Sequence, residues 1–311
     1  MAESQLSTTE QVATIWGLGG LTVRQLAKKV FAGINDDNLL GRAGELAFNF
    51  VLALFPLLIF LLSLLGLFAS RGSTLRTHLM SYLASVLPPD AAHVITHTLQ
   101  EVMRNASNGK LTFGIVLTIW FASGGMSSMV SALNGVYEVK DSRSWIKVRA
   151  ICFALTIAIS VLIIAALAAV LSGGYVAQVL GNYFDLREAA ILSWRVLQFL
   201  VAVVFVIFSF SLIYYFAPDV EEQHWYWITP GSLIGVLLWI AASFGFRAYL
   251  HFFNTYSKTY GSLGAVMILL MWLYVTGFAF LIGGEINAQI EHAAARHGHP
   301  EAKAPGEKKA S

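Results

Sequence analysis

Polar side chains stand at the ends of two long apolar segments, and they are the residues best placed to do chemistry. Arg42, Glu45 and Asn49 lie at positions i, i+3 and i+7, so a helix places them on one face. Glu285 and Asn287 follow the last apolar segment of the chain. Ionisable groups in membrane helices usually face the interior of the bundle or a wet cavity. We therefore predict that Arg42 or Glu45 joins the two residues after the last segment in one polar cluster. Such a cluster could handle a substrate. Separate contacts with lipid headgroups are the alternative.

A second group of polar residues ends another apolar segment. Arg247, His251 and Asn254 share a helix face at i, i+4 and i+7. This cationic end could receive an anionic headgroup or solute, and we expect it on the external side of a membrane. Anchoring at the interface is the alternative, because tyrosines are typical of that layer and three lie close by, at positions 249, 256 and 260.

The residues that could support an enzyme or a metal site are few. His93, His97 and Glu101 lie at i, i+4 and i+8, and two histidines four residues apart can share a metal ion. No third ligand of comparable strength is evident, so a solvated helix face is the simpler interpretation. The chain has no glycine-rich phosphate loop with a lysine, and no acid–base groups beside a basic groove such as a ribonuclease needs. We predict no enzymatic activity, no cofactor, no metal and no nucleic-acid partner.

The composition explains why these polar groups stand out. Hydrophobic residues make up 57% of the 311 residues and charged residues only 12%, whereas soluble domains carry about 25% charged residues. A net charge of +2 is too small to indicate a nucleic-acid-binding domain. A helix needs about 20 apolar residues to span a bilayer. Six segments satisfy this: residues 46–69, 111–130, 150–171, 196–217, 228–250 and 262–283. The fold class is therefore all-α, with six transmembrane helices.

The glycines of these segments allow two interpretations. Gly231 and Gly235, like Ala279 and Gly283, have the four-residue spacing that lets helices approach closely in lipid. The run from Ser123 to Ser128 interrupts the second segment. It could break that helix and expose backbone groups to a substrate, as in some transporters, or it could simply pack.

The segments outside the six spans complete the expected organisation. We expect a cytoplasmic N-terminal segment (1–45), a membrane domain (46–290) and a disordered cytoplasmic tail (291–311). Twelve Lys and Arg lie on the side of the two termini and seven on the other, so both termini should be cytoplasmic. We expect no signal peptide before the first span, because the first 45 residues are polar or amphipathic. The long connection 70–110 should contain helices on the external side.

An amphipathic pattern marks the N-terminal segment. Apolar residues recur at helical spacing between Val23 and Ile34, opposite Arg24, Lys28 and Lys29. This helix could lie in the inner-leaflet interface with its cations near anionic lipid, or it could pack on the cytoplasmic mouth of the bundle. The pattern favours neither alternative.

Several blocks of sequence resemble the YihY/BrkB family of bacterial inner-membrane proteins, once labelled ribonuclease BN. Residues 42–48 (RAGELAF) and 53–56 (ALFP) resemble the family's opening span. Residues 120–123 and 132–137 (ALNGVY), followed by Arg143, resemble the exit of its second span. Residues 260–266 (YGSLGAV), 272–274 (WLY) and 284–288 (GEINA) resemble its last span. Their order and spacing hold from about residue 35 to residue 290. The sequence departs from the family at Phe48-Asn49-Phe50, where two tyrosines followed by a small or β-branched residue are expected. The resemblance implies a six-span fold and an envelope-related transport role.

The function expected from these observations is that of an integral inner-membrane protein. It should transport or arrange a lipid or another anionic envelope component, with membrane lipids as its partners and no nucleotide-driven engine of its own. A membrane scaffold without transport is the first alternative. A membrane-bound hydrolase is a distant one.

Overall fold

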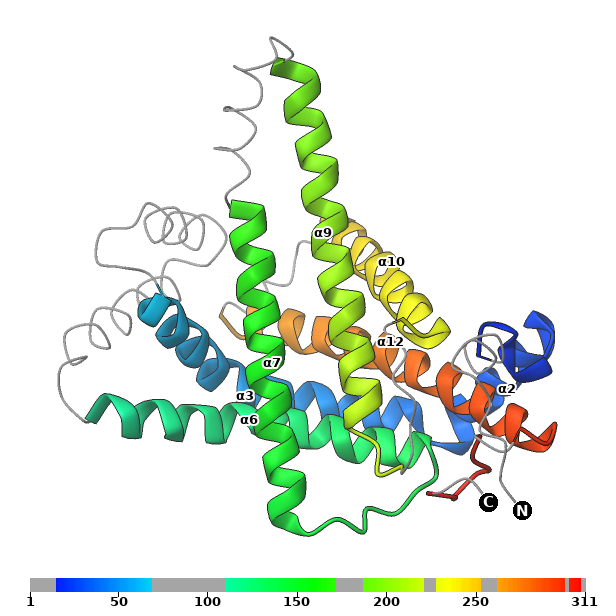
Figure 1. Cartoon of the computed structure of the whole chain (residues 1–311). Coiled ribbons are helices and arrows are strands. Elements are labelled where there is room, and N and C mark those ends of the chain that lie inside the picture. The colour runs from blue at the N-terminus through cyan, green and yellow to red at the C-terminus, as the bar shows by residue number, and fades with distance from the viewer. Residues whose placement is uncertain are drawn as a thin grey trace, which may run out of the picture. The chain divides into compact units, whose positions relative to one another are not determined.

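The computed structural model describes residues 15–68, 110–171, 187–220, 228–252, 262–299 and 302–308. The regular elements within these ranges are all helical, as predicted (Figure 1). They are the short 3-10 helix η1 (Leu18–Gly20) and the α-helices α2 (Val23–Asp36), α3 (Leu39–Phe68), α6 (Lys110–Val136), α7 (Trp145–Leu171), α9 (Arg187–Phe216), α10 (Pro230–Phe252) and α12 (Ser262–Arg296). Residues 70–109, which include His93, His97 and Glu101, lie outside the described ranges.

Each of the six long helices overlaps one of the six predicted apolar segments. Within the described residues, four stretches are long and apolar enough to cross a membrane: Trp145–Leu167, Val196–Phe216, Pro230–Leu250 and Val266–Arg296. Several apolar helices of this length in one chain are typical of a multi-pass membrane protein.

The chain divides into two compact units. The first comprises Met1–Leu52, Gly124–Leu155 and Ile207–Ser311, and the second comprises Ala53–Ser123 and Thr156–Val206. Helices α3, α6, α7 and α9 contribute residues to both units, whereas α2, α10 and α12 belong to the first. All the polar sites described below are made by residues of the first unit.

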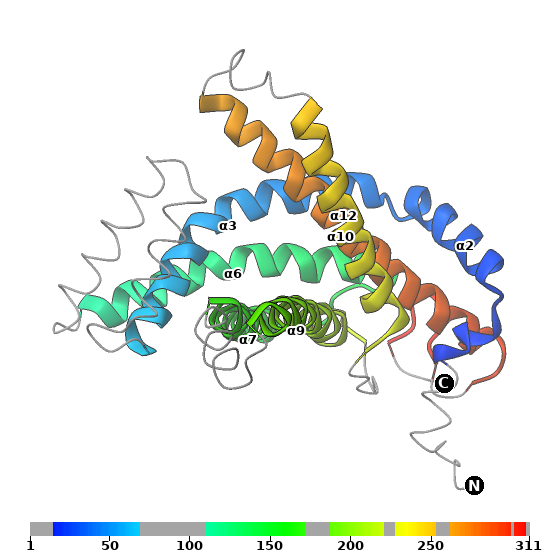
Figure 2. The ribbon, with the colours of Figure 1, turned by 90° about the horizontal axis from the view of Figure 1, so that it is seen from above.

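Helices α10 and α12 lie against each other along a seam of glycines (Figure 2). A Cβ on Gly231 would overlap the carbonyl oxygen of Gly283, and a Cβ on Gly235 would lie 3.3 Å from the Cα of Gly283. The Tyr214 hydroxyl sits over the same seam and donates a hydrogen bond of 2.6 Å to the carbonyl oxygen of Phe280. The predicted close packing of these glycines is therefore confirmed.

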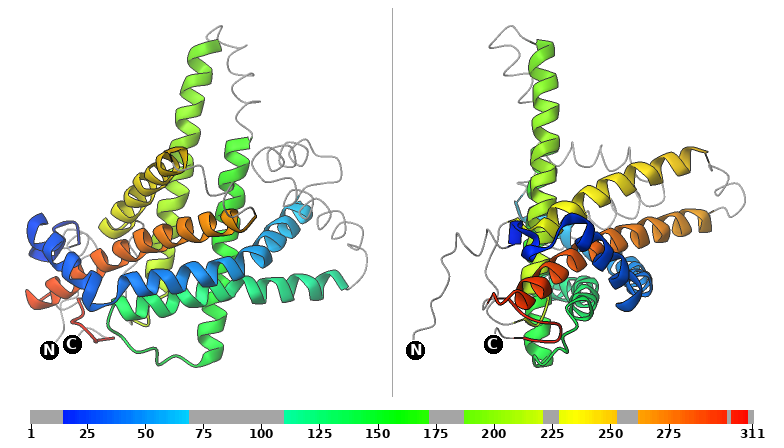
Figure 3. Two further views of the ribbon diagram at one scale, coloured as in Figure 1. Left: turned by 180° about the vertical axis from the view of Figure 1, so that it is seen from behind. Right: turned by 90° about the vertical axis from the view of Figure 1, so that its right-hand side faces the viewer.

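Helix α2 packs on α12, as the view from behind shows (Figure 3). Thr22 and Gln25 form a capping box at its start, which satisfies two free backbone N–H groups. Leu26 and Val30 are buried against Ile286 and Ile290. One face of this helix therefore contacts the bundle.

Helix α6 runs without interruption through Ser123–Ser128. The Ser123 hydroxyl donates a hydrogen bond of 2.8 Å to the carbonyl oxygen of Trp120, so its donor is satisfied within the helix. Of the two interpretations that the sequence left open, the broken helix is therefore wrong, because serine and glycine lower helix propensity without removing backbone hydrogen bonds.

Candidate functional site

A buried carboxyl group on α12 is the centre of the site. Glu285 is 0% exposed, and Gln289, one turn further along, donates a hydrogen bond of 2.9 Å to its Oε1. The carboxyl group lies against the backbone of α2 at Gly33, where a Cβ would overlap Oε1. Only glycine leaves room for the carboxyl group at this contact.

A second carboxyl group comes from the residue that follows α2. Asp37 Oδ2 lies 3.4 Å from the position that a Cβ on Gly33 would occupy, which brings it to the same side of α2 as the Glu285 carboxyl. Burial raises the pKa of Asp37 above its ordinary value, and the negative charge of Glu138 adds to the rise, whereas its interactions with Glu285 and Arg42 lower it. Two acidic groups therefore meet where α2 contacts α12.

Arg42 holds the corner between α2 and α3. Its Nε donates to the carbonyl oxygen of Asp37 at 2.8 Å, and its guanidinium lies against Gly135 near the end of α6, where a Cβ would overlap it. Its charge acts on Asp37, but no hydrogen bond of Arg42 to Glu285 occurs among the described residues. The Glu285 Oε2 atom accepts no hydrogen bond from the part of the chain that the structure describes.

The remaining residues of the predicted cluster lie elsewhere. Glu45 is exposed on α3, and Asn49 donates to the carbonyl oxygen of Glu45 at 3.0 Å, so it bonds its own helix. Asn287 binds the start of α10: its Oδ1 accepts from the Gly231 N–H at 2.9 Å, and its Nδ2 donates to Thr229 Oγ1 at 3.0 Å. It thus completes the N-terminal cap of α10 from a neighbouring helix.

The predicted external cationic site is described only in part. Arg247 is exposed on α10, the His251 side chain falls outside the described part of the chain, and so does Asn254. Helix α10 runs antiparallel to α12, since Gly231 and then Gly235 follow α12 backwards toward Ala279. Arg247 lies sixteen residues beyond Gly231, about 24 Å along the helix, so it does not reach the Glu285 end.

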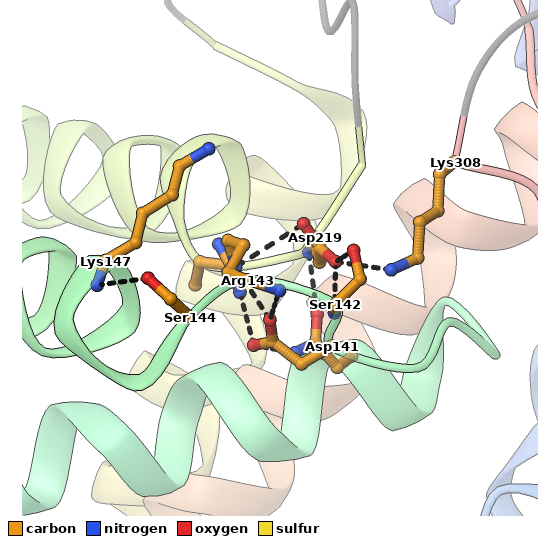
Figure 4. A network of polar contacts seen from close by, with 9 residues as sticks. Asp141, Ser142, Arg143, Ser144, Lys147, Asp219 and Lys308 are labelled. Atoms are coloured by element: carbon orange, nitrogen blue, oxygen red, sulfur yellow. Dashed lines mark hydrogen bonds and ion pairs between the residues drawn. The ribbon is translucent and has the colours of Figure 1, made fainter.

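A second polar network joins the ends of α6, α7 and α9 (Figure 4). Arg143, whose side chain is 7% exposed, binds Asp141 through two parallel hydrogen bonds of 3.0 and 2.8 Å. It also donates to the carbonyl oxygen of Ala217 at 2.9 Å, just after α9. Asn134 of α6 donates to Asp141 at 2.9 Å and accepts from the backbone N–H of Asp219 at 2.7 Å.

Asp219 is the acceptor at the middle of this network. Both the backbone N–H and the hydroxyl of Ser142 donate to its Oδ2, at 2.8 and 2.9 Å, and Lys308 pairs with the same oxygen. Burial alone would raise its pKa, but the bonds from Lys308 and Ser142, with the charge of Arg143, lower the pKa of Asp219 to about 2. We call these residues, from Asn134 and residues 141–143 to Asp219 and Lys308, the loop clasp.

Charged side chains of the C-terminal residues form ion pairs within the first unit. Helix α12 continues to Arg296, and Lys303 is buried with its Nζ 3.5 Å from Glu291 Oε1. With the Lys308–Asp219 pair, two ion pairs attach residues 302–308 to the rest of the first unit.

Within the ranges that the structure describes, no group of three His, Cys, Asp or Glu side chains is placed to hold a metal ion. His297 instead makes a contact of 2.9 Å through Nδ1 with the carbonyl oxygen of Gly19. The two acidic side chains at the α2–α12 contact are the chemically unusual feature.

The comparisons with known proteins agree with this architecture. The family model described as "Virulence factor BrkB" matches residues 30–307. The chain belongs to the BrkB family. It is 30% identical over 261 residues to YfkH of Bacillus subtilis (strain 168), a protein named as ribonuclease-like; the match covers 84% of this chain and 93% of that protein. No solved structure matches the chain.

A second group of relatives carries the name UPF0761 membrane protein. The chain is 27% identical over 258 residues to such a protein from Xanthomonas oryzae pv. oryzae (strain PXO99A), and to another, XAC0937, from Xanthomonas axonopodis pv. citri (strain 306). Each match covers 82% of this chain and 58% of the relative, so the chain spans little more than half the length of these proteins. This BrkB-family chain is an integral membrane protein with several apolar helices.

Sequence reasoning predicted Arg42 and Glu285 as members of a polar cluster, but it predicted no site at the loop clasp. Asn134 and Arg143 of the loop clasp stood out only as parts of the blocks that resemble the family. Asp37 and Asp219 follow helix ends, where no periodic pattern marks them. Their one available signal is that acidic residues are uncommon in a chain with so few charges.

Proposed function

We propose that this BrkB-family protein transports or arranges an anionic lipid or another anionic envelope component in the bacterial inner membrane. The observation that supports this most strongly is the buried Glu285 carboxyl group, which meets Asp37 while Arg42 lies beside them. Ionisable residues in membrane segments are costly to bury and usually mark a pathway for a substrate or an ion.

A purely structural role explains this acidic pair poorly. Replacing buried ionic groups by apolar residues of similar size is often neutral or stabilising, so burial of a carboxyl group is weak evidence for stability. Here Glu285 has only the neutral Gln289 amide as a donor among the described residues. The contrast with the loop clasp, whose acidic groups are met by several donors, points to a functional reason for keeping Glu285.

The proposed topology has six spans with both termini in the cytoplasm. Helices α3 and α6, of 30 and 27 residues, are long enough to add two spans to the four apolar stretches described above. The predicted excess of Lys and Arg on the side of the termini supports the orientation. It places the Glu285 end of the bundle toward the cytoplasm.

The proposal gives α2 an interfacial position as well as its packing on α12. Val23 and Phe31 are 73% and 71% exposed on the face next to the buried Leu26 and Val30. The exposed Arg24 and Lys28 lie along one edge of this apolar strip, next to Phe31. An apolar strip bordered by cations suits the inner leaflet, whose anionic headgroups attract basic residues. Both alternatives that the sequence left open are thereby combined.

The test uses purified protein reconstituted in vesicles of phosphatidylethanolamine and phosphatidylglycerol that contain a trace of fluorescent phosphatidylglycerol. Dithionite bleaches only the outer leaflet, so lipid movement appears as fluorescence lost beyond the protein-free level. We expect faster loss with the wild-type protein and a reduction in Arg42→Gln. Glu45→Gln, an exposed change on the same helix, serves as the control.

Other outcomes would assign a different function. If wild-type vesicles behave as protein-free vesicles do, and native mass spectrometry finds no anionic lipid retained by the protein, a scaffold role is favoured. Release of a cleaved lipid would indicate a hydrolase instead.

A further inference from the structure

The acidic pair between α2 and α12 has an unusual balance of charge. Glu285 is fully buried, its Oε1 accepts from Gln289, and its Oε2 has no donor within the described residues. A carboxylate in such a place lacks the hydrogen bonds that normally compensate for lost hydration. Among the described residues, Oε2 is therefore left for a proton or a bound ligand to satisfy.

The surrounding charges indicate what that is. The other titratable groups around the pair come from three helix ends: Asp36 at the end of α2, Arg42 on α3, and Tyr137 and Glu138 after α6. Burial, with the charges of Glu291 and Glu285, raises the pKa of Tyr137 well above its ordinary value, so it stays neutral. Three carboxyl groups besides Glu285 thus face one guanidinium, and that guanidinium is bonded to a backbone carbonyl oxygen.

A proton fits this arrangement better than a metal ion. A protonated carboxyl group has one O–H donor, and the neighbouring carboxylate is an acceptor in need of one. Two carboxyl groups that share a site cannot both ionise readily, so one proton stays with the pair. A divalent cation would need further oxygen ligands, and the positive charge of Arg42 beside Asp37 opposes it.

We propose that Asp37 and Glu285 form a proton-binding site in which the two carboxyl groups share one proton across the contact between α2 and α12. The Gly33 backbone lets them meet, because any side chain there would displace the Glu285 carboxyl. Loss of the proton leaves two adjacent negative charges, one at the end of α2 and one on α12, and their repulsion loosens the contact. Proton release is thereby coupled to movement of the corner between α2 and α3.

If the protein transports a substrate as proposed above, the proton bound at this site is the ion that drives transport. In that case, the proton moves between the Asp37–Glu285 pair and the cytoplasm as the α2–α3 corner moves. No covalent change is involved, since the pair only binds and releases H⁺.

The test is chemical labelling with dicyclohexylcarbodiimide, which reacts with protonated carboxyl groups in apolar surroundings. The purified full-length protein is treated across a range of pH and its modification is measured by intact-mass and peptide mass spectrometry. We expect one label on Glu285 at neutral pH and its loss in alkaline solution. Glu285→Gln should abolish the label, and Glu45→Gln should retain it.

Asp37→Asn provides a second variant that keeps Glu285 and conserves shape. Removing the second acidic group should shift the loss of labelling to lower pH by about one unit or more, because the like charge that holds the proton is gone. Size-exclusion profiles of all variants verify that each is folded.

Two results would overturn the site. One is wild-type protein that is not labelled at Glu285 at any pH. The other is labelling that sodium or potassium chloride suppresses at constant pH, which would show a metal cation in place of the proton. Labelling as expected without lipid movement would contradict the transport function and leave the proton site intact. Lipid movement without labelling would contradict the proton site and leave the transport function intact.

Discussion

Replacing Gly231 by alanine tests the glycine seam that holds α10 on α12. A Cβ at this position would overlap the carbonyl oxygen of Gly283 and the Asn287 Oδ1 atom. The first is backbone and cannot swing aside, so α10 must move away from α12. Over-packing of this kind costs typically about 1–3 kcal/mol. Displacing Asn287 also breaks its bond to the Gly231 N–H, which is worth about 1 kcal/mol.

The expected loss is therefore about 3 kcal/mol in the free energy of unfolding, measured by titration with sodium dodecyl sulfate from a mild detergent. Gly245→Ala on the same helix is the matched control, because a Cβ at Gly245 would meet nothing within 4 Å. Alanine favours helix over glycine by about 1 kcal/mol, so this control should be neutral or slightly stabilising.

Equal stability of the two variants would refute the reasoning. It would mean that α10 and α12 do not approach at Gly231 as closely as the structure has them. A loss in both variants would also contradict it, since the effect would then come from alanine itself rather than from the contact.

The two remaining predictions concern the cap of α10 and the loop clasp. Asn287→Ala should lower the free energy of unfolding by about 1–2 kcal/mol, because it leaves the Gly231 N–H without its acceptor, whereas Asn49→Ala should change it little; equal effects in the same titration would count against the cap. The folded-state pKa of Asp219, about 2, lies below that of a free aspartate, so its bonds stabilise the fold above about pH 4 and this contribution is lost as pH falls toward 2. Asp219→Asn should cost on the order of 2 kcal/mol at neutral pH and flatten the pH dependence of thermal unfolding between these limits; a variant that keeps the wild-type slope would show that another group is responsible.

The helices were predictable because the physics that specifies them is local. A long run of apolar residues must satisfy its backbone hydrogen bonds internally, and that alone locates the six long helices. Their ends were less predictable. Helix α12 extends thirteen residues beyond the predicted end at 283, through Glu285 and His292, because α2 and the C-terminal residues cover side chains that hydropathy treats as exposed.

The candidate site was predictable only where a helix face carries it. The predicted partners Arg42 and Glu285 both interact electrostatically with Asp37. The spacing of the sequence gave no reason to include Asp37, because the turn between α2 and α3 determines where its side chain points. Glu45 shares the helix face of Arg42 by spacing, but it is exposed, since the faces of α3 that contact other helices depend on the tertiary fold. Gly33 matters through what approaches it, and this is invisible in the sequence.

The two polar centres of the first unit differ in a way that separates stability from function. In the loop clasp, Asp141 and Asp219 are each met by Arg143 and by further donors, so their charges are compensated and tie three helix ends together. At the α2–α12 contact, Glu285 has one neutral donor and an acidic neighbour. A fold that needed only cohesion at this point would be served as well by an apolar side chain, as buried ionic groups elsewhere show. The incomplete pairing of Glu285 is therefore the better indication of where this membrane protein acts, and the complete pairing of Asp219 of where it is held together.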